Sequence, residues 1–114
     1  MAVQKRTQLK RSKVTYEDDL MRRLSDPEYA IGYLNEAIEE KDNRVFLLAL
    51  RDVAQAWGGM TELSRKAKIP RISLYKVLSK NGNPELDTLR NIVKVFGLRI
   101  ALIPEHSHNY RRAA

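Results

Sequence analysis

The sequence predicts an all-α fold, and two observations support this. Apolar residues recur every three or four positions over residues 27–40, 43–57, 60–79 and 85–96, which is the spacing of one face of a helix. Most of the glycine and proline residues lie near the borders of these stretches, where helices start and stop. Because the chain has 114 residues, we expect one domain with a single core, over residues 16–103.

The N-terminal part carries strongly uneven charge. Residues 1–16 hold five basic and no acidic residues, whereas residues 17–42 hold nine acidic and three basic residues. We interpret residues 1–15, which lack apolar periodicity, as a disordered basic tail. The spacing of Leu20 and Leu24 predicts a short helical turn after this tail. Two basic regions on either side of an acidic one indicate separate faces for separate partners, or simply a solvated acidic helix.

The first long helix is predicted from Pro27 to about Glu40. Asp26 is the expected N-cap and Pro27 the first helical residue. Three glutamates are expected to face outward, Glu36, Glu39 and Glu40. The inward face is expected to hold Ala30, Ile31, Leu34, Ala37 and Ile38.

The second long helix is predicted to be the core helix. Asp42 or Asn43 caps its start, and Gly58-Gly59 ends it. Trp57, the single tryptophan, is expected to pack in the core rather than to bind a ligand. The wide apolar face is expected to hold Val45, Phe46, Ala49, Leu50, Val53, Ala54 and Trp57.

Residues 60–79 predict two short helices joined by a tight corner, a helix-turn-helix. Leu63 and Ala67 give the first helix an apolar face, and Leu74 and Leu78 do the same for the second. Pro70 suits the first turn of a helix and moves the residue before it out of the helical region. Six basic residues and one acidic residue lie between 60 and 80. This unit places its second helix in the major groove of DNA.

The C-terminal part predicts one helix and one strand. Residues 85–96 form an amphipathic helix that ends at Gly97. Residues 98–103 are apolar and β-like, and residues 104–114 are a polar, flexible tail. Because a lone strand is not stable, residues 98–103 must pair with a second copy, with a partner chain or with the N-terminal segment.

Overall composition favours a nucleic-acid partner. The formal net charge is +7 and the isoelectric point is about 9.9, which favours an anionic partner. No apolar run approaches the roughly 20 residues of a membrane span, so we expect no membrane. The chain has no cysteine and no apolar run that would make its basic N-terminus a secretory signal. We therefore expect a reducing cytoplasm as its location.

Residues that could carry chemistry are few. His106 and His108 lie two apart in the tail, which is too little for a metal site, and no glycine-rich phosphate loop is present. Ser73 has no predicted histidine partner. We therefore expect no enzyme activity, no metal and no cofactor.

The exposed side of the second helix of the pair holds the predicted DNA contacts. Arg71 and Ser73 are placed to reach base edges, and Ile72 is exposed beside them. Tyr75 and Lys76 are interpreted as backbone contacts. Thr61, near the start of the preceding helix, is placed to bind a phosphate. The alternative for each residue is an ordinary solvated helix surface.

The order of these parts resembles two known groups. The core helix, GGMTELSRKAKIPRISLYKVLS and NGNPELDTLRNIVKVFGL resemble the five-helix lambda-repressor-like (Cro/C1, Xre) DNA-binding domain. The pattern L-x-D-P-E-x-A-x-x-Y-L-x-x-A-x-E over 24–39 and LYKVLS-x-x-GNP over 74–84 resemble the probable addiction-module antidote proteins. Two positions depart from the repressor pattern. Lys68 replaces a glycine, at a cost of about 1–2 kcal/mol in a left-handed conformation, and Ser64 replaces an alanine.

The resemblance implies an antitoxin that represses its own operon. Such proteins bind a small basic toxin of the RelE/ParE-like superfamily and act as homodimers on palindromic operator DNA, in the cytoplasm at the nucleoid. The resemblance also implies that five of the predicted DNA contacts lie where the repressor domain touches DNA, namely Thr61, Arg71, Ser73, Tyr75 and Lys76. The acidic region would then offer the toxin-binding residues, which we predict to be Glu17, Asp18, Asp19, Glu36, Glu39 and Glu40. The alternatives are a stand-alone phage-type repressor and an interaction module that has lost DNA binding.

Overall fold

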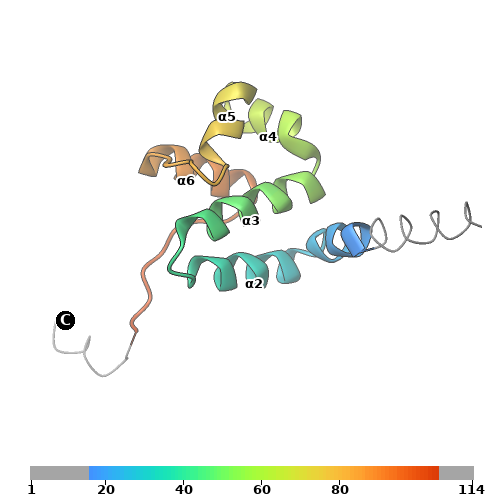
Figure 1. Ribbon diagram of the computed structural model, residues 1–114, viewed down its shortest axis with the longest axis vertical. Coiled ribbons are helices and arrows are strands. Elements are labelled where there is room, and N and C mark those ends of the chain that lie inside the picture. The colour runs from blue at the N-terminus through green and yellow to red at the C-terminus, as the bar shows by residue number, and fades with distance from the viewer. Residues whose placement is uncertain (1–15, 106–114) are drawn as a thin grey trace, which may run out of the picture. The chain divides into compact units, whose positions relative to one another are not determined.

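The computed structural model describes residues 16–105, and these residues are all-helical (Figure 1). The tail predicted at 1–15, most of the tail predicted at 104–114, and both histidines lie outside the described residues. Residues 16–24 form a first helical segment. The helices that follow it are α2 (Pro27–Ile38), α3 (Asn43–Ala56), α4 (Gly59–Ala67), α5 (Arg71–Val77) and α6 (Leu86–Val95).

The predicted caps start α2 and α3. The carboxylate of Asp26 accepts a hydrogen bond from the backbone N–H of Glu28 at 3.2 Å, and Pro27 is the first helical residue. The carboxylate of Asp42 likewise accepts from the N–H of Arg44 at 2.9 Å. Each bond satisfies one of the backbone donors that the start of a helix leaves unpaired. α2 ends two residues before the predicted end, at Ile38.

Of the described residues, 16–84 form one compact unit. Within it α2 packs on α3, α3 on α4, and α4 on α5 (Figure 1). The indole N–H of Trp57 donates to the carbonyl of Leu24 at 2.6 Å, so this half-buried tryptophan ties the first helical segment to the end of α3. The most deeply buried large side chains of this unit are Leu24, Leu50, Val53, Leu74 and Leu78.

The predicted inward faces of α2 and α3 are partly wrong. Val45 is 39% exposed and Ile38 is 53% exposed, whereas Leu47, which we did not assign to the core, is 4% exposed. The run VFLLAL offers two apolar faces with helical spacing, and the packing of α2 selects the one that holds Leu47 and Leu50. Val45 and Leu48 are therefore left at the surface, where they form part of a cleft described below.

The described residues 85–105 form a second compact unit that contains α6. α6 ends in a Schellman motif, in which the N–H of Leu98 donates to the carbonyl of Val93 and the N–H of Gly97 to that of Lys94, both at 2.9 Å. Gly97 has φ +79°, as its predicted terminating role requires. The strand predicted at 98–103 is not formed in this single chain. Among the described residues no strand is present to pair with it.

Candidate functional site

A three-residue connection joins α4 to α5, within the stretch predicted at 60–79. Lys68 has φ 58° and ψ 42°, which is the left-handed conformation, and it is the one non-glycine residue between 16 and 105 with positive φ. A lysine there pays the predicted backbone cost. Pro70 takes the N-cap position, so α5 begins at Arg71, one residue later than predicted.

Ser64 stabilises this connection directly. Its hydroxyl donates to the carbonyl of Ile69 at 2.5 Å, and the N–H of Ile69 donates to the carbonyl of Ser64 at 3.2 Å. The side chain therefore satisfies a backbone acceptor that an alanine at this position would leave to water. Sequence reasoning treated Ser64 only as a departure from the repressor pattern.

The structure brings five of the six predicted DNA-contacting residues onto α5. Arg71, Ile72, Ser73 and Lys76 are exposed, and Tyr75 is half-buried. Ile72 is 75% exposed, so its apolar side chain lies at the surface between Arg71 and Ser73. Thr61, the sixth residue, is exposed in the first turn of α4. The buried residue of α5 is Leu74, so most of this helix presents its side chains outward.

Tyr75 of α5 lies beside two arginines, one on α3 and one on α5 itself. The guanidinium carbon of Arg51, on α3, lies 4.9 Å from the centroid of the Tyr75 ring, and that of Arg71 lies 5.5 Å from it. Both distances are typical of cation–π contacts. Two cations are thus held beside one aromatic ring of α5. Sequence reasoning missed Arg51. The one hint in the sequence is that a basic residue interrupts the apolar pattern of α3.

Part of the positive charge on α4 is offset within the helix. Glu62 accepts from Arg65 at 2.6 Å and lies 3.6 Å from the ammonium of Lys66. The hydrogen bond from Arg65 lowers the pKa of the Glu62 carboxyl below its ordinary value. This carboxylate therefore offsets one of the two positive charges that Arg65 and Lys66 bring to α4.

The six predicted toxin-binding carboxylates lie on two separate surfaces. Glu17, Asp18 and Asp19 lie on the first helical segment, where Asp19 forms ion pairs with Arg22 and Arg23 of the same helix. The other three, Glu36, Glu39 and Glu40, line a cleft between α2 and α3 that holds none of the first three.

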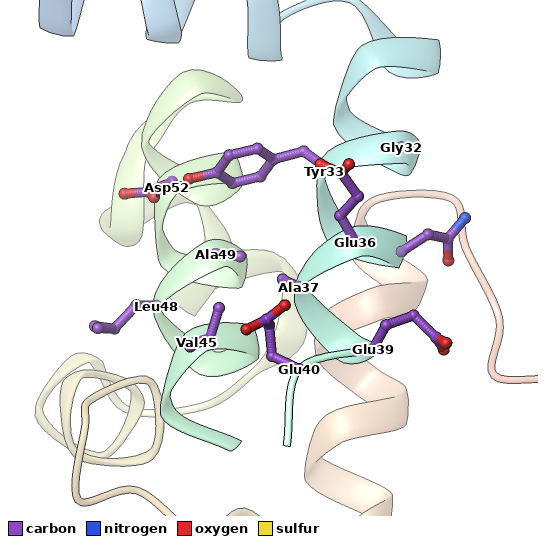
Figure 2. A pocket seen from close by; sticks show the side chains of 11 residues that line it. Gly32, Tyr33, Glu36, Ala37, Glu39, Glu40, Val45, Leu48, Ala49 and Asp52 are labelled. Carbon is purple, nitrogen blue, oxygen red and sulfur yellow. Dashed lines mark hydrogen bonds between the residues drawn. The ribbon is translucent and has the colours of Figure 1, made fainter. Parts of the chain in front are cut away.

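This cleft has a volume of about 850 Å³ and combines carboxylates with an apolar floor. Figure 2 shows Glu40 between the two helices near Ala37 and Val45, whereas Glu39 points away from α3. Leu48, on α3, is 40% exposed at the side of the cleft. Asp52 is a fourth lining carboxylate that sequence reasoning missed, because α3 and α2 come together only in the folded chain.

Tyr33 spans the cleft from α2 to α3 (Figure 2). Its hydroxyl donates to the carboxylate of Asp52 at 2.7 Å. Burial, followed by this hydrogen bond, raises the pKa of the Tyr33 phenol far above its ordinary value. The phenol donates to one wall carboxylate and holds it in place.

Neither a metal site nor a membrane-spanning helix is present among the described residues. Between residues 16 and 105, no group of three or more histidine, aspartate or glutamate side chains is arranged to hold a metal ion. No helix within that range has the length and apolar content to cross a membrane.

Comparison with known proteins identifies the family. Residues 15–104 match the family model described as "Probable addiction module antidote protein". This chain belongs to that family. An uncharacterized protein of Haemophilus influenzae is 37% identical over 81 residues, which cover 71% of this chain and 82% of that protein. No solved structure matches the chain significantly.

Proposed function

We propose that this antidote protein neutralises a RelE/ParE-like toxin by binding it, and that it represses its own operon by binding DNA. The observation that carries the DNA half is α5, a short helix with a single buried residue and two exposed bases. The connection before it has the length of the turn in a helix-turn-helix. The proposed activity is binding rather than catalysis, and it places the protein in the cytoplasm, at its operator.

In the proposed complex α5 lies in the major groove, as in lambda-repressor-like domains. Arg71, at its first position, reaches a guanine edge or a phosphate, and Ser73 comes close enough to donate to or accept from a base. Ile72 is suited to contact a thymine methyl group. Thr61, Lys76 and Arg51 contact the backbone, and Tyr75 holds Arg51 and Arg71 in position.

The proposed DNA-binding form is a homodimer, and the second compact unit supplies its interface. Leu102 is 98% exposed and Ile103 is 85% exposed, so the segment after α6 leaves apolar side chains uncovered in the single chain. Pairing of residues 98–103 between two copies would cover them and complete the predicted strand. A two-fold dimer would set two α5 helices about 34 Å apart, one turn of DNA.

Titration of the purified protein with the DNA upstream of its gene tests the DNA half. Arg71→Ala is expected to weaken binding by about 1–3 kcal/mol if Arg71 contacts a base, or to lower the salt slope by about one unit if it contacts a phosphate. Lys41→Ala removes one exposed base from the connection between α2 and α3 and serves as the matched control. If Arg71→Ala changes neither affinity nor slope, the assignment of α5 is wrong.

Co-expression with the adjacent reading frame tests the toxin half. We expect a stable complex with a small basic protein whose growth inhibition the antidote relieves. A gene without such a neighbour would favour the stand-alone repressor, whose fold and DNA contacts are the same.

A further inference from the structure

We propose that the cleft between α2 and α3 is the toxin-docking site, and that it takes an amphipathic helix presenting an arginine or lysine flanked by apolar side chains. This inference rests on the proposed toxin neutralisation. It differs from the sequence prediction in two ways, since it adds Tyr33, Val45, Leu48 and Asp52 and leaves out the carboxylates of the first helical segment.

Charge selects the kind of side chain that enters the cleft. Glu36 and Glu40 come from α2 and the residues after it, and Asp52 comes from α3, so negative charge surrounds the cleft on both helices. Of the eleven lining residues, all within the described part of the chain, none is basic. A basic side chain placed here gains attraction from several carboxylates, and a partner with negative charge is repelled.

The apolar floor of the cleft indicates that the partner also presents apolar side chains. Ala37 and Ala49 are small and buried, whereas Val45 and Leu48 are each about two-fifths exposed. Lysine and arginine carry an apolar stem below a charged end, which matches an apolar floor below carboxylates. Neighbouring apolar side chains of the same helix would cover Val45 and Leu48 and remove them from water.

Gly32 supplies an independent reason to expect close approach by another chain. It lies inside α2, where glycine costs roughly 0.5–1 kcal/mol relative to alanine. Among residues 16–105, no atom lies within 4 Å of a Cβ added at Gly32, so no neighbour in that range requires the glycine. Gly32 lines both this cleft and a smaller adjoining hollow of about 380 Å³. The surface therefore continues along α2 as a shallow track on which a partner backbone can lie.

Tyr33 makes part of the site rigid before binding. Its hydrogen bond to Asp52 fixes the direction of that carboxylate, and the ring forms one end of the cleft (Figure 2). A fixed carboxylate loses less conformational entropy when a guanidinium or ammonium pairs with it.

The test uses the full chain and the product of the adjacent reading frame, with affinities measured by calorimetry. The double substitution Glu36→Lys with Glu40→Lys is expected to weaken the complex by about 100-fold or more. The same change at the competing acidic surface, Glu17→Lys with Asp18→Lys, is expected to weaken it by less than about threefold. Glu36→Gln with Glu40→Gln repeats the first test with little change in shape, and circular dichroism verifies the fold of every variant.

The outcomes separate this inference from the function on which it rests. If the unmodified chain does not bind the product, the proposed toxin neutralisation fails. If the unmodified chain binds, three results overturn the cleft assignment and leave the function standing. These results are cleft variants that bind as tightly as the unmodified chain, a loss of affinity in the Glu17 and Asp18 variant alone, and an equal loss of affinity in both double variants.

Methyl NMR signals identify the occupant directly. The signals of Val45 and Leu48 are expected to shift when the complex forms. In the free chain, deletion of residues 1–13 is expected to leave the same signals unchanged. A shift caused by that deletion would mean that the basic N-terminal segment already occupies the cleft. A shift that follows the concentration of the free chain would mean that a second copy occupies it. Either result would overturn the proposal.

Discussion

The outward side of α5 and the cleft between α2 and α3 differ in charge, in shape and in how much of each a single helix supplies. α5 is one helix of seven residues and presents two exposed bases, Arg71 and Lys76. The carboxylates of the cleft, in contrast, come together only because two helices pack side by side. A projecting basic helix fits a groove in DNA, and a hollow acidic surface fits a basic side chain of another protein. The two surfaces therefore lie on different helices and carry opposite charge, as the proposed binding of two oppositely charged partners requires.

The change with the largest expected effect should damage both surfaces together. Leu50, on α3, is 0% exposed, and α3 contacts both α2 and α4. Leu50→Ala is expected to reduce the free energy of unfolding by about 2–5 kcal/mol. Thermal unfolding measures the loss, and binding of both partners should weaken in step with the unfolded fraction. Loss of one activity alone would show that the two surfaces do not share α3 as a support.

A change at Tyr75 should affect one surface alone. Tyr75→Leu removes the ring between Arg51 and Arg71, and DNA affinity is expected to fall by about 0.5–2 kcal/mol. Tyr75→Phe keeps the ring and is the matched control. Fluorescence anisotropy with the upstream DNA measures the effect. Equal affinity in the leucine and phenylalanine variants would remove Tyr75 from a positioning role.

Lys68→Gly tests the cost of the turn before α5. Glycine adopts the left-handed conformation without the steric cost of a side chain, so the free energy of unfolding is expected to rise by about 1 kcal/mol. Urea denaturation measures this gain. A loss of stability would mean that the Lys68 side chain contributes more than its backbone conformation costs.

The cap of α3 should show a pH dependence of smaller size. The hydrogen bonds from Arg44 lower the pKa of the Asp42 carboxyl below its ordinary value of 3.8. Since the folded pKa is the lower one, this stabilisation is present above pH 3.8 and is lost as the pH falls through the folded value. Asp42→Ala is expected to lower the melting temperature at pH 7 and to have no effect in strong acid. An equal effect at both pH values would rule out the ionised cap.

Local rules predicted the helix starts and ends well. Asp26, Pro27, Asp42 and Gly97 each take the role that their chemistry requires, because a cap depends on a few neighbouring residues. The exposed side of α5 was also predicted, because Leu74 marks the buried side of the helix and basic residues lie around it.

Features that depend on how helices pack were not predictable in the same way. The periodicity of α3 allowed either Val45 or Leu47 to face inward, and only the position of α2 decides between them. Asp52 and Tyr33 are 19 residues apart, and Arg51 meets Tyr75 across two helices, so neither pair has a local signal. The strand predicted at 98–103 is not formed in the single chain.

The most direct test of the account is the binding of Arg71→Ala to both partners in parallel titrations. The account predicts that this variant loses about 5- to 150-fold in affinity for the upstream DNA, while its affinity for the product of the adjacent reading frame stays equal to that of the unmodified chain. Unchanged affinity for DNA, or an equal loss for both partners, would contradict the assignment of the two functions to separate surfaces.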